Sequence, residues 1–286
     1  MKKFIYETLL KLKAMRIRRK NLRNRYKRIN MTRFYMNRMR EARWGVSYSV
    51  FDGVELLKAS LTNIRPHVNY INVVYQDVSW YGEPSPEPLL PMLEDMQKEG
   101  LIDKIIFYEP DLKLTAGTNE RLKRNIGLED AKRNGVEYYM SMDVDEFYVA
   151  SEIEAAKYMI IKKQITRACV KQELYGSKPT QKILYNINSF VPFFSRINRF
   201  STHSKDPKLP CLCDPNRQLN HQFGSLYYVI HKCSMHHMSI VRKDIKGKMR
   251  NSSGIKICPS GKRLYPKPSP FYTLCADVEN WFNITI

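Results

Sequence analysis

Two aspartates separated by one residue, Asp143 and Asp145, follow directly on an apolar run at 138–142. The run has the composition of a buried strand, and Glu146 comes after the second aspartate. In an open α/β sheet, ligands bind beyond the carboxyl ends of the strands. Carboxylate oxygens are the ligands that Mg²⁺ and Mn²⁺ prefer, and such an ion neutralises a departing diphosphate. We therefore predict that Asp143 and Asp145 bind a divalent ion together with a diphosphate.

Two adjacent histidines, His236 and His237, lie between a strand-like stretch at 226–233 and a basic stretch at 240–250, which we predict to be a helix. The imidazole nitrogen is a common ligand of divalent metals. One histidine could complete the shell of the ion while the other supports it, and both could equally be core residues. We predict that one of the two binds the ion.

Glycine-rich phosphate loops are absent, because the chain contains neither G-x-x-x-x-G-K-[ST] nor G-x-G-x-x-G. A sheet that binds a diphosphate without such a loop needs a metal ion and cationic side chains instead. Lys123, Arg124, Arg217 and the basic stretch at 240–250 can supply the cations. Arg124 could equally be an ordinary surface cation.

Strands and helices are predicted to alternate around these residues. The predicted strands are 45–50, 68–75, 104–108, 138–142, 167–173 and 226–233, and the predicted helices are 54–64, 89–97, 119–134, 153–163 and 240–250. Alternation of this kind indicates a parallel, doubly wound sheet. Asp52 is predicted to cap the helix at 54–64, to contact a base or ribose, or to do both. The stretch 186–219 is poor in helix signals and rich in turns.

The net charge of +20 is concentrated in residues 1–43, which hold 16 Lys and Arg residues against two Glu residues. We expect a basic helical arm at 1–43, a body at 44–257 and a proline-rich tail at 258–286. The arm could bind an anionic membrane surface, could be a solvated helix, or, as the least favoured choice, could bind nucleic acid. No apolar run is long enough to span a bilayer. We expect a cytoplasmic protein that could associate with the cytoplasmic face of a membrane.

Taken together, these motifs make residues 44–254 resemble the GT-A fold glycosyltransferases of the family 2 type, which use nucleotide sugars. The resemblance rests on residues 46–57, 73–79, 120–128, 143–148, 191–193, 214–217 and 236–245. It implies an α/β fold with a mostly parallel sheet flanked by helices. It also implies Mn²⁺ or Mg²⁺ as the cofactor, bound by Asp143, Asp145 and His237. The nucleotide-binding residues that we carry over are Asp52, Gln76, Lys123, Arg124 and Asp143.

The catalytic base is the point at which the chain departs from the family pattern. Such enzymes usually place the base in a Glu-Asp pair that opens a helix well after the aspartate motif, and this chain has no such pair. We predict Asp214 as the substitute, with Glu173 as the second choice. Glu146 is predicted to orient a sugar hydroxyl or to support the metal ligands, and a structural capping role fits it equally well.

These observations predict a metal-dependent glycosyltransferase of the hexosyltransferase type. Its donor is expected to be a nucleotide sugar, UDP-linked as the first choice, and its acceptor a glycan, a lipopolysaccharide or a glycolipid. The alternative is a non-catalytic module that uses a transferase-like fold to bind a ligand and is tethered by the arm to a membrane or to nucleic acid.

Overall fold

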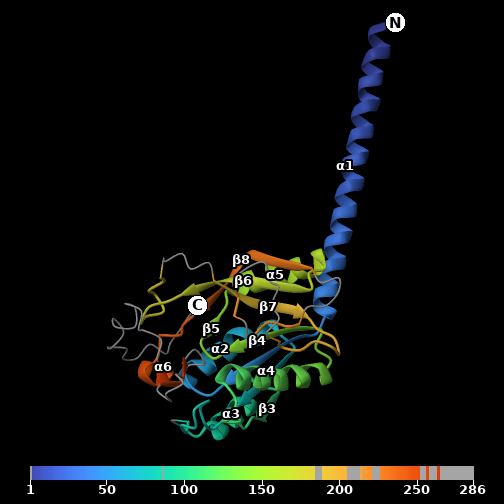
Figure 1. Ribbon diagram of the computed structural model, residues 1–286. Helices are drawn as coiled ribbons and strands as arrows, with labels where there is room; N and C mark the ends of the chain where they lie inside the picture. Colours follow the sequence, from blue (N-terminus) through green and yellow to red (C-terminus); the bar gives the residue numbers. More distant parts are fainter. Residues whose placement is uncertain are drawn as a thin grey trace. The chain divides into compact units, whose positions relative to one another are not determined.

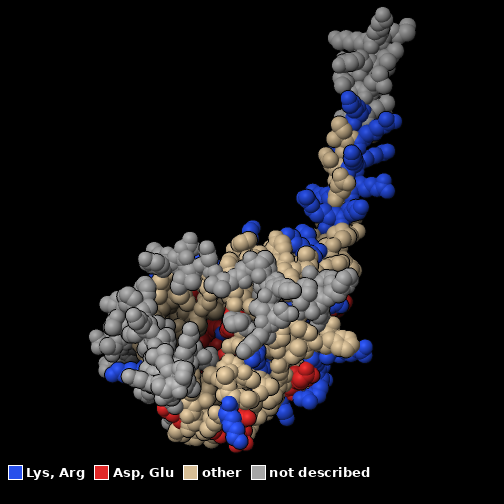
Figure 2. Space-filling view, viewed as in Figure 1, with Lys and Arg blue, Asp and Glu red and all other residues tan. Residues whose placement is uncertain are grey.

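The structure is a computed structural model that describes residues 2–85, 87–183, 189–204, 213–214, 216–220, 226–251, 256–257 and 263–264. The chain divides into two compact units, residues 1–42 and residues 43–286. The predicted tail at 258–286 lies outside the described residues except for 263–264. The first unit is formed by helix α1 (Lys2–Glu41). Lys and Arg side chains cover much of the described part of this helix (Figure 2). No helix in the described part of the chain is both long and apolar enough to cross a membrane.

A mixed sheet organises the second unit (Figure 1). Within the described residues it has eight strands in the order β3-β2-β1-β4-β7-β6-β8-β5. The strands are β1 (Trp44–Val50), β2 (Tyr70–Tyr75), β3 (Lys104–Phe107), β4 (Tyr138–Asp143), β5 (Glu146–Phe147), β6 (Arg167–Leu174), β7 (Phe190–Arg196) and β8 (Tyr227–His237). A separate hairpin pairs β9 (Lys256–Ile257) with β10 (Arg263–Leu264).

The helical elements alternate with the strands in the first half of this unit. They are η1 (Val54–Leu56), α2 (Leu57–Ile64), η2 (Arg65–His67), α3 (Leu89–Lys98), α4 (Ala116–Arg133), α5 (Ala150–Lys163) and α6 (Ile245–Asn251). Strands β3, β2, β1 and β4 are all parallel, as expected for β-α-β units. Strand β7 is antiparallel to β4 and β6, β8 is parallel to β6, and β5 is antiparallel to β8. The predicted α/β class is confirmed, but the sheet is mixed rather than wholly parallel.

Helices cover both faces of the sheet, as the alternation of side chains along β1 demonstrates. A Cβ atom placed on Gly127 of α4 would lie only 1.9 Å from the Ser47 hydroxyl oxygen, so α4 packs directly on the Ser47 face. The next residue, Tyr48, points to the opposite face, where its hydroxyl lies 2.8 Å from Ser60 of α2. Helices α4 and α2 therefore cover opposite faces of the same strand.

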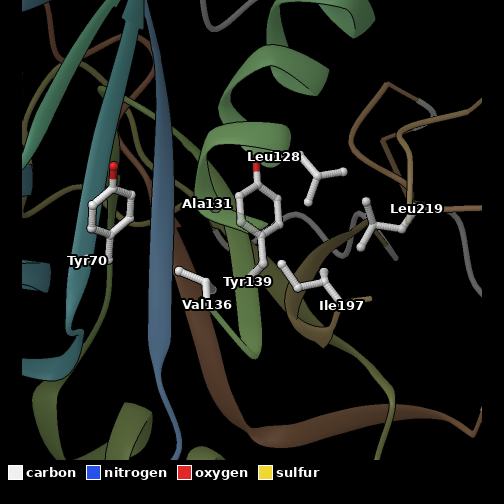
Figure 3. Close-up of a cluster of buried hydrophobic side chains, with 7 residues drawn as sticks. All are labelled: Tyr70, Leu128, Ala131, Val136, Tyr139, Ile197 and Leu219. Atoms are coloured by element: carbon white, nitrogen blue, oxygen red, sulfur yellow. The ribbon is translucent and has the colours of Figure 1, made fainter. Parts of the chain in front are cut away.

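A cluster of buried apolar side chains fixes α4 against the sheet (Figure 3). Its members are Tyr70, Leu128, Ala131, Val136, Tyr139, Ile197 and Leu219. Burying one large apolar side chain contributes about 1.5–3 kcal/mol, so this cluster is a substantial part of the core. It holds Arg124, near the middle of α4, close to the carboxyl end of β4.

Three local predictions differ from the structure. Asp52 does not cap a helix, because the residue at the start of η1 is Gly53, in a left-handed conformation, and no side chain caps that end. The basic stretch at 240–250 is helical only from Ile245, so Arg242 lies in the turn that precedes α6. The stretch 186–219, expected to consist mainly of turns, contributes strand β7.

Candidate active site

The aspartate motif lies in a tight connection between two strands. Asp143 is the last residue of β4, and Glu146 begins β5. Strand β5 pairs with the end of β8, with Glu146 opposite His237. The Met238 amide also donates a hydrogen bond of 2.8 Å to the Asp145 carbonyl oxygen. The backbone therefore places His237 beside Asp145, although the two residues are far apart in the sequence.

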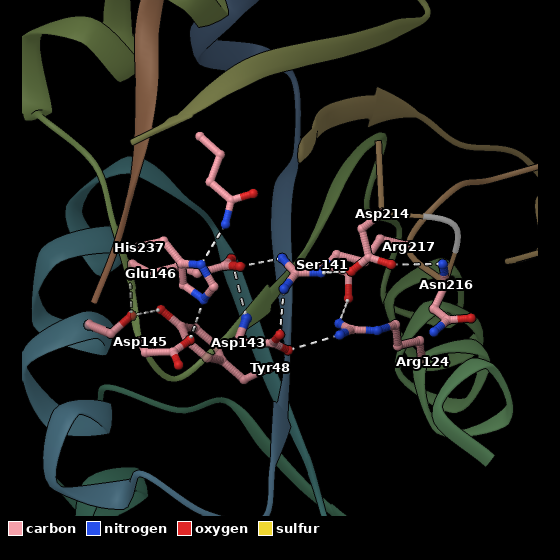
Figure 4. A network of polar contacts seen from close by, with 12 residues as sticks. Tyr48, Arg124, Ser141, Asp143, Asp145, Glu146, Asp214, Asn216, Arg217 and His237 are labelled. Carbon is pink, nitrogen blue, oxygen red and sulfur yellow. Dashed lines mark hydrogen bonds and ion pairs between the residues drawn. The ribbon is translucent and has the colours of Figure 1, made fainter. Parts of the chain in front are cut away.

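Arginines surround the carboxylates of this motif (Figure 4). The Arg124 guanidinium donates to Asp143 Oδ1 at 2.9 Å, to Glu120 Oε1 at 2.8 Å and to the Ser141 hydroxyl at 2.8 Å. The guanidinium of Arg217 forms ion pairs with both Asp143 and Glu146. Both guanidiniums are buried, so the acidic centre is held by charges that water barely reaches.

Asp214 extends the same network toward solvent. Its carboxylate lies 3.0 Å from Arg217 Nε, and a third of its side chain is exposed. Its other oxygen accepts a hydrogen bond of 2.9 Å from the Asn216 amide. Glu146 is fully buried by contrast. Of the two carboxylates predicted to be catalytic, Asp214 is the one that a molecule in solvent can reach.

A third buried arginine, Arg242, joins the end of β1 to the aspartate motif. One of its nitrogens donates to Asp52 Oδ1 at 2.9 Å, and another pairs with Asp145 Oδ2. Lys248 Nζ lies 3.5 Å from the same Asp145 oxygen. A Cβ atom on Gly53 would be 2.6 Å from the Arg242 guanidinium, so the guanidinium packs directly on this glycine. Asp52 thus contributes to the site through Arg242 instead of through a helix cap.

These ion pairs set the protonation states of the acids. Burial alone would raise the pKa of Asp143, but Arg124 and Arg217 outweigh it and hold that pKa below its usual range. Burial is likewise outweighed at Asp145, where Lys248 and Arg242 lower the pKa. For Glu146 burial is the stronger influence, and its pKa is raised despite Arg217. The two aspartates are therefore ionised at neutral pH and can bind cations.

A divalent ion fits this arrangement, because one buried carboxylate oxygen has no hydrogen-bond partner. Asp145 Oδ1 is buried and has no hydrogen-bond partner, and it lies 3.4 Å from His237 Nε2. Two neighbouring ligands of one ion are about 3 Å apart when each bond is about 2.1 Å long. The orientation of the His237 ring is fixed by a hydrogen bond at its other nitrogen, because Nδ1 lies 2.5 Å from the side-chain amide of Gln172. Which tautomer the ring adopts depends on the orientation of that amide.

The net charge of the described ion-pair network also favours the binding of a divalent ion. The ion-pair network joins six carboxylates to four cations, an excess of two negative charges. No group of three or more His, Cys, Asp or Glu side chains among the described residues could hold a metal by itself. Magnesium-type ions commonly take their remaining ligands from substrate phosphates and water. The residues therefore fit an ion that shares its ligands with a diphosphate.

Lys123 lines a cavity of about 120 Å³ beside the network, and the buried Gln76 contacts Lys123. The Lys123 ammonium donates to the Val50 carbonyl at 2.7 Å and to Gln76 Oε1 at 3.0 Å. The Trp80 ring centroid is 5.6 Å from this ammonium. A second cavity, of about 390 Å³, shares Asp52, Arg242 and Lys248 with the first. Ligand-sized space therefore adjoins the acidic centre on the Asp52 side.

The structure brings together almost all of the predicted site residues. Those joined in the network or lining its cavity are Asp52, Lys123, Arg124, Asp143, Asp145, Glu146, Asp214 and His237. Gln76 is connected to them only through its hydrogen bond with Lys123. Glu173, the second choice of base, instead pairs with Lys171 and Lys182. Sequence reasoning missed Gln172 and Trp80, for which the sequence holds no signal beyond their residue types.

Comparison with known proteins found no matching family model and no matching curated sequence. Among solved structures, S. aureus TarS 1-349 in complex with UDP-GlcNAc matches with a TM-score of 0.36 and 14% identity, over 46% of this chain and 35% of that chain. GalNAc-T7 with UDP, GalNAc and Mn²⁺ matches with a TM-score of 0.45 and 12% identity, over 68% of this chain and 44% of that chain. The chain spans less than half the length of these structures. Both are similarities to GT-A glycosyltransferases at low sequence identity.

Proposed function

We propose that this chain is a glycosyltransferase of the hexosyltransferase type that uses a nucleotide sugar, UDP-linked as the first choice. The observation that carries the proposal is the site at the carboxyl ends of β1 and β4. There Asp143, Asp145 and Glu146 are fixed by three buried guanidiniums, and one of these, that of Arg242, lines two cavities. Such a cluster of fixed charges is suited to a ligand whose negative charge changes during the reaction.

Binding of the diphosphate depends on the cations that line the cavities. Lys248 has a side chain about one-third exposed and lines both cavities, as does Arg242. Their positive charges attract the phosphate oxygens, and ion pairs with Asp145 and Asp52 hold the two cations in place. As the bond from the anomeric carbon to the phosphate oxygen breaks, negative charge grows on the diphosphate, and the same cations stabilise it.

Asp145 and His237, through Oδ1 and Nε2, are the residues that would hold Mn²⁺ or Mg²⁺. When bound, the ion supplies further positive charge to the leaving diphosphate. Gln172 keeps the His237 ring in place. Asp143 contributes mainly by anchoring Arg124 and Arg217, because each of its oxygens pairs with one of these guanidiniums. This division of roles differs from the expectation that both aspartates are direct metal ligands.

Asp214 is the carboxylate that we assign as base. It takes the proton of the acceptor hydroxyl as the hydroxyl oxygen bonds to the anomeric carbon. Glu146 is fully buried and ion-paired to Arg217, which suits a positioning role. The acceptor class that we propose is a glycan, a lipopolysaccharide or a glycolipid.

Metal-dependent stabilisation by UDP tests the proposal. The full chain is heated with UDP and Mn²⁺, with either one alone, and with GDP and Mn²⁺. UDP at about 100 times its dissociation constant should add about 2.7 kcal/mol to the free energy of unfolding. Hydrolysis of UDP sugars with Mn²⁺ is measured in parallel. Absence of both stabilisation and hydrolysis would refute the proposal, whereas stabilisation without any turnover would favour the non-catalytic binding module.

Variants separate the metal ligands from their neighbours. We expect His237→Ala to weaken the Mn²⁺ dependence of activity by about 10- to 100-fold, and His236→Ala to change it much less. Asp145→Asn should abolish activity, but it also removes one of the two carboxylate partners of buried Arg242, so the free energy of unfolding is measured alongside. Asp77→Asn is the matched control, because Asp77 is exposed just after β2 and outside the network. Equal metal curves for both histidine variants would remove His237 from the metal site.

A further inference from the structure

Helix α1 carries exposed apolar side chains as well as its positive charge. The described residues contain fourteen exposed large apolar side chains, and seven of them lie between residues 15 and 34. These seven are Met15, Ile17, Leu22, Tyr26, Ile29, Met31 and Phe34. Half of the exposed apolar residues thus lie on a short part of one helix.

Four of these residues share one face of the helix. Met15, Leu22, Tyr26 and Ile29 are spaced by seven, four and three residues. With 3.6 residues per turn, they lie within an arc of about 60° around the helix axis. We call these four residues the apolar stripe. Ile17, Met31 and Phe34 lie on other faces, so the stripe is the main but not the sole apolar surface of the helix.

Basic residues flank the apolar stripe on both sides. Arg18 and Arg25 border one edge, and Arg19 borders the other. Long Lys and Arg side chains can place their alkyl parts along an apolar surface and their charged ends in a polar layer. Figure 2 shows basic side chains along this part of the helix.

The combination of charge and stripe selects among the possible partners. A second copy of the helix would bring two strongly basic arms together, which like-charge repulsion opposes. Nucleic acid would bind the cations but would leave the stripe in water, because phosphate contacts need only positive charge. An anionic bilayer accepts both features, with the cations at the lipid headgroups and the stripe among the acyl chains.

We propose that α1 binds the surface of anionic membranes and lies in the headgroup region with the apolar stripe toward the lipid. The helix is too polar to cross the bilayer, so it attaches to one leaflet. This interaction is separate from the proposed transferase activity, because it involves residues of α1 alone and needs no nucleotide.

Vesicle binding by the full chain, without nucleotide or metal, tests the proposal. Sedimentation with phosphatidylcholine vesicles is compared with sedimentation with vesicles that also contain 30% phosphatidylglycerol, a composition we choose to give a strongly anionic surface. We expect binding to the anionic vesicles only, and weaker binding as salt rises.

The two features of the helix are removed separately. One variant changes Arg18, Arg19, Arg23 and Arg25 to Gln, and its control changes Lys104, Arg133, Arg196 and Arg199, all exposed on the body, to Gln. The other changes Leu22, Tyr26 and Ile29 to Gln, and its control makes the same change at exposed Leu90, Leu112 and Leu122. Glutamine preserves helix formation.

We expect the arm charge variant to bind anionic vesicles about 100-fold or more weakly, and the arm apolar variant about tenfold or more weakly. The body controls should bind as the parent protein does. Equal losses in arm and body variants, equal binding to both vesicle types, or no vesicle binding would overturn the proposal. So would binding of single-stranded or duplex RNA without vesicle binding, or dimerisation that the stripe substitutions abolish. Nucleotide stabilisation of the arm variants shows separately whether the transferase proposal stands.

Discussion

Replacement of Lys123 by methionine should change how the stability of the protein depends on pH. The Lys123 side chain is buried, lines the smaller cavity and donates hydrogen bonds to Val50 and Gln76. Burial, reinforced by the neighbouring Arg124 charge, lowers the pKa of Lys123 to about 7, although Asp143, Asp52 and Glu120 oppose this. The lysine is therefore close to half-protonated at neutral pH.

The sign and size of the effect follow from this pKa. In the unfolded chain the pKa of lysine is about 10.4, so unfolding above pH 7 takes up a proton. The free energy of unfolding must then rise with pH in this window. At about 1.4 kcal/mol for each pH unit and proton, Lys123 should contribute a rise of about 2 kcal/mol between pH 6.5 and 8.5. The Lys123→Met variant should lack that rise.

Urea unfolding at pH 6.5, 7.5 and 8.5 measures the difference directly. The parent and Lys123→Met curves should diverge by about 2 kcal/mol across this range, with unchanged dependence on urea. Lys58→Met, at an exposed lysine, controls for the loss of a surface charge. A difference that stays constant within about 0.5 kcal/mol would show that Lys123 is not poised near neutrality. If it is poised there, a diphosphate nearby should raise its pKa, and calorimetry in two buffers should detect proton uptake on UDP binding at pH 7.5.

Three further substitutions test the packing of the site. Gly127→Ala should lower the free energy of unfolding by about 1–3 kcal/mol, because the added methyl group clashes with Ser47 and this outweighs the better helix propensity of alanine. In the double variant with Ser47→Gly, urea titrations should show that most of this loss is restored. Arg217→Met should cost about 3–5 kcal/mol by the same measurement, because it leaves buried carboxylates unpaired; a cost below about 1 kcal/mol would contradict the ion-pair network. Gly53→Ala should lower the melting temperature more than Gly100→Ala, since both glycines have positive φ but only Gly53 packs on Arg242; equal shifts would contradict that contact.

The sequence predicted the parallel half of the sheet well, because its strands are apolar runs separated by periodic helices. The strand predicted at 138–142 is β4, and the helix predicted at 119–134 is α4 within a few residues. Since parallel strands end at one edge, the proximity of Asp52 and Asp143 followed from topology alone. The helical arm was also predicted, because its composition lacks Gly and Pro.

In the other half of the sheet, the strands predicted at 167–173 and 226–233 are β6 and β8, whereas β5 and β7 were not predicted. Strand β7 contains a proline and follows a stretch of turn-forming residues, so its local sequence does not favour a strand. The strand forms because it pairs with distant segments of the chain. The ion pairs of Arg242 depend on a turn that packs on Gly53, and no local sequence pattern predicts a contact between two such distant segments. The register that sets Glu146 opposite His237 also depends on pairing between distant segments, which residue types alone do not specify.

The pairing of β5 with β8 and the contact between Arg242 and Asp52 have a consequence for how the chain folds. The residues of that ion pair are 190 positions apart, and those joining Arg217 to Glu146 are 71 apart. Contacts of such long sequence separation form late and slow folding. During synthesis, the aspartate motif would emerge well before Arg217, Arg242 and Lys248 and would remain without these partners until they followed. Completion of the site should therefore be among the last events of folding.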